Sequence, residues 1–175
     1  MTDPRYPLGP WVRPETIATD DLRAAIAAIT ALPGDLAELV AGRAADELDR
    51  TIRPGAWTVR QLVHHLADSH VNAYCRHRLA LTEDDPAIRP YDEVAWSNLA
   101  DATGAPVATS LTLLAALHTR WALLLESLDP ALFGRTFRHP QRAEPWTLAE
   151  SVLHYAWHGR HHAAQIAAAL DAGRG

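Results

Sequence analysis

Apolar residues return every three to four positions in four long stretches of the chain, which is the spacing of one face of an α-helix. The first stretch contains Pro33 and Gly34, so it predicts either one kinked helix or two short ones. No stretch shows the strict alternation that is typical of a half-buried strand. We therefore expect an all-α fold, a four-helix bundle. The four stretches are residues 19–50, 58–81, 110–128 and 147–171.

The second and fourth helices are expected to begin in the same way. Each is preceded by Trp-Thr, and the threonines, Thr58 and Thr147, are followed three residues later by Gln61 and Glu150. A threonine at the N-cap with Gln or Glu at the third helical position forms a capping box, in which each side chain accepts a hydrogen bond from the other residue's backbone. These two helix starts are the best-defined ones in the sequence.

The segments between the helices are long. Residues 1–18 contain several prolines and predict an extended arm, while residues 19–172 would form the helical bundle. A long connection joins the second and third helices, with one helical turn near residues 93–100, and connections of this length are often functional. Residues 131–145 predict irregular structure or a short hairpin.

Composition narrows the class of protein. A chain of 175 residues suits a single domain, 1–175, and its 48% hydrophobic and 21% charged residues are ordinary for a globular protein. No apolar run approaches the roughly 20 residues that span a membrane, and the N-terminus lacks a secretory pattern, so we expect a cytoplasmic protein without a membrane partner. A net charge of −5 without a basic cluster argues against nucleic acid. The single cysteine, Cys75, excludes an intramolecular disulfide.

Ten histidines are unusual in a chain of this size. His158 and His162 are four residues apart on the predicted fourth helix, so they share a face and are spaced to chelate one metal ion. His154 could extend this row, whereas helix geometry turns His161 away, to the surface or to a position behind a ligand.

A third ligand must come from another element, and the second helix offers adjacent His64 and His65. The helical phase of its apolar residues, Leu62, Leu66 and Ala73, turns His65 toward the core, which leaves His64 facing outward or flanking the site. Asp68, one turn after His65, could orient a ligand imidazole, coordinate the ion, or be a plain exposed residue. The other histidines are expected to be surface residues or hydrogen-bonded structural ones. They are His70, His77, His118 and His139.

Three neutral imidazoles suit zinc, nickel, cobalt or iron better than magnesium or calcium. Three protein ligands also leave coordination positions open, as in catalytic sites. The sequence thus predicts one divalent metal ion per chain.

Residues 57–70, 81–93, 110–121 and 155–162 are similar, in this order, to the YfiT-type metal-dependent hydrolases of the DinB superfamily, a group that includes bacillithiol S-transferases and mycothiol-dependent relatives. The resemblance implies a DinB/YfiT-like four-helix bundle, a homodimer, and zinc or nickel on His65, His158 and His162. Most members carry Arg-Gly-Gln soon after the last histidine, where this chain has Ala-Ala-Gln at residues 163–165.

Three functions fit these features. The first is transfer of a low-molecular-weight thiol, bacillithiol- or mycothiol-like, to an electrophilic small molecule by a metal-bound thiolate, with Arg160, Arg120 or Arg89 holding the carboxylates of the thiol. The second is hydrolysis by metal-activated water, with Asp68 as the base. The third is a metal-binding dimerisation bundle without catalysis.

Overall fold

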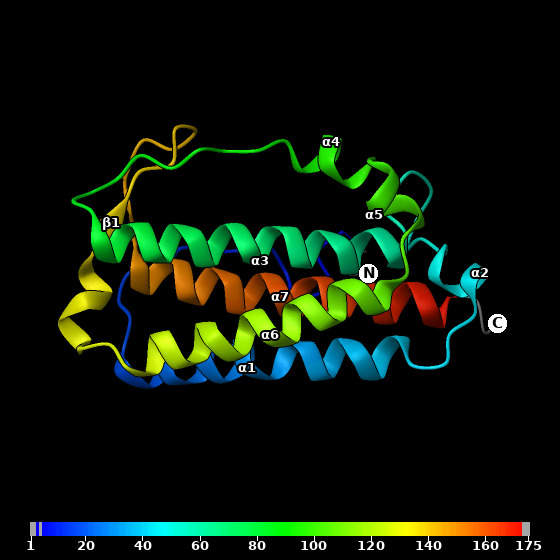
Figure 1. Cartoon of the computed structure of the whole chain (residues 1–175), viewed down its shortest axis with the longest axis horizontal. Helices are drawn as coiled ribbons and strands as arrows, with labels where there is room; N and C mark the ends of the chain where they lie inside the picture. The colour runs from blue at the N-terminus through cyan, green and yellow to red at the C-terminus, as the bar shows by residue number, and fades with distance from the viewer. Residues whose placement is uncertain (1–2, 4, 173–175) are drawn as a thin grey trace.

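The computed structural model describes residue 3 and residues 5–172, and its four long helices lie side by side as a bundle (Figure 1). Helix α1 packs against α6 and α7, and α3 packs against the same two helices. The prediction of a four-helix bundle is therefore confirmed. The four helices are α1 (Thr19–Val40), α3 (Val59–Thr82), α6 (Val107–Glu126) and α7 (Leu148–Asp171).

Short elements occupy the connections between the long helices. The expected single turn near residues 93–100 is two short helices, and they lie with the α3–α6 connection along the outside of the bundle (Figure 1). Of the two alternatives expected for residues 131–145, the short hairpin is present: residues 136–137 and 146–147 pair antiparallel, and these two-residue strands are too short to show the alternation of a strand. The short elements are α2 (Ala45–Leu48), α4 (Glu93–Ser97), α5 (Ala100–Gly104), the 3-10 helix η1 (Pro130–Gly134), β1 (Thr136–Phe137) and β2 (Trp146–Thr147).

Both predicted capping boxes are present, at the starts of α3 and α7. Thr58 accepts a hydrogen bond from the backbone N–H of Gln61 at 3.1 Å, and the Gln61 side chain accepts one from the backbone of Thr58 at 3.0 Å. Thr147 and Glu150 repeat this exchange at 3.1 and 2.9 Å. Glu150 also accepts from Arg13 Nε at 2.5 Å, which ties the N-terminal arm to the start of α7.

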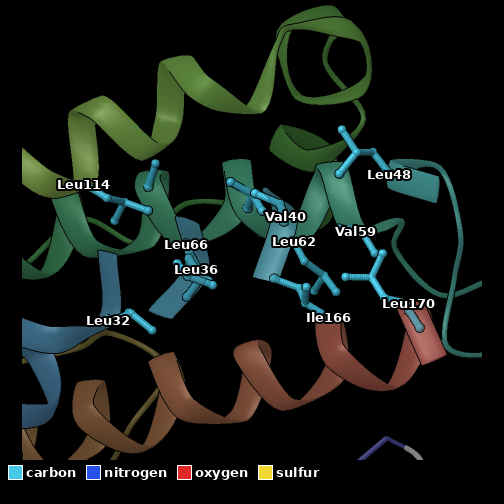
Figure 2. Packing of buried hydrophobic residues seen from close by; sticks show 13 residues of the cluster. Leu32, Leu36, Val40, Leu48, Val59, Leu62, Leu66, Leu114, Ile166 and Leu170 are labelled. Carbon is cyan, nitrogen blue, oxygen red and sulfur yellow. The ribbon is translucent and has the colours of Figure 1, made fainter. Parts of the chain in front are cut away.

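Leucine, isoleucine and valine side chains from all four long helices form the core at one end of the bundle (Figure 2). Leu36 of α1, Leu66 of α3, Leu114 of α6 and Ile166 of α7 are fully buried in it. Burial of such side chains is worth about 1.5–3 kcal/mol each, so this cluster holds α3 and α7 at a fixed separation.

Helix α6 bears on the expectation that no apolar run approaches the length of a membrane span. It is long and apolar enough to cross a membrane by length and composition, because Thr, His and Arg interrupt its apolar run without lowering its average hydropathy enough. In the bundle it buries Leu114, His118 and Trp121 against its neighbours, while Leu113 and Leu123 stay exposed.

Candidate metal site and its cavity

Three histidines from two neighbouring helices meet between α3 and α7. His65 lies on α3, and His158 and His162 lie one turn apart on α7. One nitrogen of each ring lies within 4.8 Å of the corresponding nitrogens of the other two, and the Nε2 atoms of His65 and His158 are 3.3 Å apart. The structure thus brings together the three residues that the sequence singled out as metal ligands.

Burial keeps all three imidazoles neutral. It lowers the pKa of His65 to about 4 and that of His162 to about 3, and it also places the pKa of His158 well below its usual value. Neutral imidazoles have a free nitrogen lone pair, which is what a metal ion requires of a histidine ligand. The donor set therefore fits a divalent ion that favours nitrogen, such as zinc, nickel, cobalt or iron.

A row of buried hydrogen bonds begins at the carbonyl of Ile29 on α1. In a regular helix this oxygen would accept from the N–H of residue 33, but Pro33 has no N–H. Instead His118 of α6 donates its Nδ1–H to the Ile29 oxygen at 2.5 Å. The proline interruption seen in the sequence thus leaves an acceptor available to a buried histidine.

The same row reaches the metal site and fixes the tautomer of each ring. Because Nδ1 of His118 carries the proton, its Nε2 accepts from His70 Nδ1–H at 2.9 Å. Nε2 of His70 then accepts from His158 Nδ1–H at 3.2 Å. The remaining nitrogen of His158, Nε2, is left without a proton and faces His65. We call His158, His70 and His118 the histidine relay; it presents a lone pair to the site.

Gln165 fixes the ring of His162. The side-chain oxygen of Gln165 accepts from His162 Nδ1–H at 2.8 Å, which leaves Nε2 of His162 for a metal. The amide nitrogen of Gln165 donates to the backbone oxygen of Arg5, also at 2.8 Å. The N-terminal arm is thereby joined to a candidate ligand through one side chain.

A cavity of about 340 Å³ opens beside the three histidines. Its wall contains aromatic rings and polar groups, and Glu93 is its only carboxylate among the described residues. A second cavity, of about 400 Å³, shares six wall residues with the first and extends to Arg142 and Trp146. The remaining wall residues of the first cavity are Trp57, Ser69, Arg76, Tyr91, His139, Gln141, His154 and Tyr155.

The neighbouring histidines have different surroundings. His64 is buried, donates its Nε2–H to the Ala105 oxygen at 3.1 Å and accepts from Ser110 at 2.7 Å, so it faces α6 and neither solvent nor the candidate ligands. His154 lines both cavities. His161 is buried, stacked on Trp157 with ring centroids 4.7 Å apart, and takes no part in the cavity.

Asp68 does not face the three histidines. Burial and the negative charge of Asp101 raise the pKa of its carboxyl group. Among the described residues no hydrogen bond joins its side chain to His65, and Asp68 does not line the cavity. The structure therefore offers no contact through which Asp68 would orient a ligand or act as a base.

The three arginines considered as cofactor ligands also lie outside the cavity wall. Arg160 is exposed and donates to the backbone oxygen of Ala156, Arg120 is exposed near the ring of Tyr74, and Arg89 is exposed in the α3–α4 connection. Two other arginines, Arg76 and Arg142, line the cavities instead.

Sequence reasoning placed His70 and His118 among structural or surface histidines and gave them no part in the site. A signal was present for His118, which lies in phase with Leu114 and Trp121 on the apolar face of its helix, where a polar group needs a partner. Arg76 follows His65 by eleven residues, just over three helical turns, and therefore shares its face of α3.

Comparisons with known proteins agree with this fold and assign the chain to a family. A model of the DinB superfamily matches residues 28–166. "Putative metal-dependent hydrolase BcerKBAB4_2443" of Bacillus mycoides (strain KBAB4) is 46% identical over 166 residues, which cover 95% of each chain. "Putative metal-dependent hydrolase YfiT" of Bacillus subtilis (strain 168) is 45% identical over 161 residues, 92% of this chain and 90% of YfiT.

A solved structure is also similar along almost the whole chain. It is described as "YfiT from Bacillus subtilis is a probable metal-dependent hydrolase with an unusual four-helix bundle topology". The TM-score is 0.92 at 43% identity, and the match covers 99% of this chain and 97% of that one.

Proposed function

The chain belongs to the DinB superfamily, and we propose that it is a metal-dependent enzyme of the YfiT type that transfers a small thiol to an electrophile. The proposal is carried by one observation: three neutral histidines open onto a cavity whose only carboxylate, among the described residues, is the exposed Glu93. An ion held by these histidines supplies Lewis acidity, which lowers the pKa of a thiol or a water molecule.

The cavity favours a thiol over water as the nucleophile. Hydrolysis by an activated water is helped by a nearby general base, and Asp68 faces α5 while Glu93 is exposed to solvent. A thiol is acidic enough to need no protein base once it lies beside a cation. The sulfur must come from a small molecule, because Cys75 is exposed and does not line the cavity.

The chain's own residues position the two reactants. The histidine relay and Gln165 hold the rings of His158 and His162 with a free nitrogen toward the site. Burial raises the pKa of Tyr91 in the cavity wall to about 12, so its hydroxyl stays protonated and can donate to a leaving group. The new carbon–sulfur bond replaces the bond to the leaving group, which departs with its electron pair, and the thiol proton goes to solvent.

Hydrolysis is the second candidate, because the relatives are named as metal-dependent hydrolases. The same three histidines would then serve a water nucleophile, with the substrate carbonyl in the same cavity. This reaction needs no thiol, which separates the two proposals experimentally.

The test is a conjugation assay with metal-loaded protein, monochlorobimane as the electrophile, and bacillithiol, mycothiol, glutathione and cysteine as separate thiols. We expect at least one thiol to react faster than in the absence of protein, and His65→Ala to abolish the acceleration. If no thiol is accelerated while ester or amide substrates are hydrolysed, thiol transfer is wrong and hydrolysis replaces it. If neither reaction is accelerated, the metal-binding bundle without catalysis replaces both.

The homodimer, the cytoplasmic location and the absence of nucleic-acid and membrane partners stay predictions from the sequence. The choice of metal among zinc, nickel, cobalt and iron is likewise left to metal analysis.

A further inference from the structure

We propose that Arg76 and Arg142, with His139 between the two cavities, form a subsite for the carboxylate of an elongated thiol whose sulfur lies at the three histidines. This inference rests on the proposed function, because it assumes a thiol at the metal site. It adds the class of thiol: one that carries a negative charge far from its sulfur.

Arg76 projects from α3 into the wall of both cavities. Its Nη1 donates to the hydroxyl of Tyr155 at 3.2 Å, and no ion pair joins its guanidinium to a carboxylate among residues 5–172. A guanidinium has five donors in a planar fork, so most of its hydrogen-bonding capacity is still available to a ligand. The one bond to Tyr155 holds the fork in place without neutralising its charge.

Arg142 lies at the far side of the second cavity. Its guanidinium carbon is 4.2 Å from the ring centroid of Trp146, which fixes the side chain by a cation–π contact. Partial burial, followed by the charge of Arg13, lowers the pKa of Arg142, and the negative charge of Glu150 offsets this only in part. An anion in the cavity would complete this compensation.

The nearby carboxylates are already engaged. Arg13 lies close to Arg142 and binds Glu150 at 2.5 Å and Glu144 at 2.6 Å. Glu93 is then the only carboxylate lining the two cavities among the described residues, against two arginines. The net charge of the lining is therefore positive although the whole chain carries −5.

The histidines of the cavity also experience this positive field. Burial, followed by the charges of Arg76 and Arg142, lowers the pKa of His139. Nδ1 of His154 has no hydrogen-bond partner among the described residues, although it is shielded from solvent. Neutral His139 offers one further N–H donor to an anion, and His154 offers a polar atom to the middle of a ligand.

Helix geometry sets the length of the ligand. Eleven residues separate His65 and Arg76, so their Cα atoms lie about 16 Å apart along α3 and only about 20° apart around it. A small neutral thiol would occupy the histidine end alone. A ligand that uses both ends needs a chain of about ten atoms between sulfur and carboxylate, allowing for the reach of the arginine side chain.

The experiment uses the full-length protein loaded with Co²⁺, whose absorption reports sulfur coordination, titrated with 11-mercaptoundecanoic acid, which has ten carbons between sulfur and carboxylate, and with 11-mercapto-1-undecanol. We expect the acid to bind at least about tenfold more tightly than the alcohol, because a charge-assisted bidentate contact is lost in the alcohol. The ratio should fall toward one in the Arg76→Gln/Arg142→Gln double variant. Arg23→Gln, which changes an exposed arginine of α1 paired with Asp20, should keep the tenfold ratio.

The outcomes separate the two proposals. If neither probe changes the cobalt spectrum, a thiol does not reach the ion, and both the proposed function and the subsite are wrong. If both probes change it with equal affinity, or the preference for the acid survives in the double variant, only the subsite is wrong. Should the double variant not fold, Arg142→Gln alone decides, because Arg142 is exposed and lies outside the core of the bundle; an unchanged ratio in it would overturn its part in the subsite.

Discussion

His118 donates a hydrogen bond to the backbone oxygen of Ile29, an oxygen that is free because residue 33 of the same helix is proline. A carbonyl only accepts, so this one contact decides which nitrogen of His118 carries its proton. Through the histidine relay, this proton position on His118 also determines which nitrogen carries the proton in His70 and then in His158. A backbone feature of α1 thereby determines which nitrogen of a candidate metal ligand faces the site.

The relay predicts that His118 affects metal affinity without touching the metal. His118→Leu removes both hydrogen bonds, and we expect metal affinity to fall about 10- to 100-fold, as is common when a partner behind a ligand is lost. His118→Gln retains a donor for Ile29 and an acceptor for His70, so it should recover much of that loss. Competition with a chromogenic chelator measures both; equal affinities of the two variants would contradict the relay.

Gln165 is expected to act on the second α7 ligand in the same way. Gln165→Leu removes the acceptor for His162 Nδ1–H, and metal affinity should fall by about one to two orders of magnitude. Gln165→Glu keeps an acceptor at that position and should retain affinity within a few-fold. If the leucine variant binds metal as tightly as the unchanged protein, Gln165 does not position His162.

Gly159 allows α1 to approach α7 closely. A Cβ atom at this position would lie 2.6 Å from Cδ2 and 3.3 Å from Cδ1 of Leu32. We expect Gly159→Ala to lower the free energy of unfolding by about 1–3 kcal/mol, measured by urea denaturation. In a Leu32→Ala background the clash is absent, and the same substitution should be neutral or stabilising because alanine favours a helix. An equal cost in both backgrounds would show that the approach of α1 is not the reason for this glycine.

His77 makes stability depend on pH. It is fully buried between Trp121, which donates to its Nδ1 at 3.0 Å, and Ser151, and burial lowers its pKa to about 3. The unfolded chain, with a histidine pKa near 6.5, therefore binds one more proton than the folded chain between pH 3 and 6.5. The stability that His77 supports is complete above pH 6.5 and is lost as pH falls through this window.

His77→Gln removes the extra proton that the unfolded chain binds at this position. Between pH 4 and 6 its free energy of unfolding should change less steeply with pH than that of the unchanged protein, by about 1.4 kcal/mol per pH unit. Denaturant titrations at several pH values measure the two slopes. Identical slopes would mean that His77 is protonated in the folded chain.

Local sequence patterns predict where α3 and α7 begin and which of their histidines face each other. Thr58 with Gln61, and Thr147 with Glu150, predict where α3 and α7 begin, because a capping box depends only on neighbours within one turn. The spacing of His158 and His162 and the apolar phase around His65 likewise predict which histidines meet, because rotation about a helix axis is set by residue number.

The relay and the cavity could not be found in this way. His118 reaches Ile29 across 89 positions of sequence, and His70 reaches His158 across 88, so these contacts depend on how the helices pack. The sequence suggests Asp68 as a residue that orients a ligand or acts as a base, because it lies one turn from His65. Helical phase instead turns its side chain toward α5 and Asp101. Arg142 comes from the β1–β2 hairpin connection, whose position no periodicity predicts.

The most direct measurement of the central claim is the metal content of purified protein, determined by mass spectrometry after reconstitution and gel filtration. We predict about one divalent ion per chain in the unchanged protein and a loss of that ion in His65→Ala. His64→Gln is the matched control, because His64 is adjacent, buried and bonded to Ser110, and it should keep the full complement. Full metal content in His65→Ala, or its loss in His64→Gln alone, would contradict a site built from His65, His158 and His162.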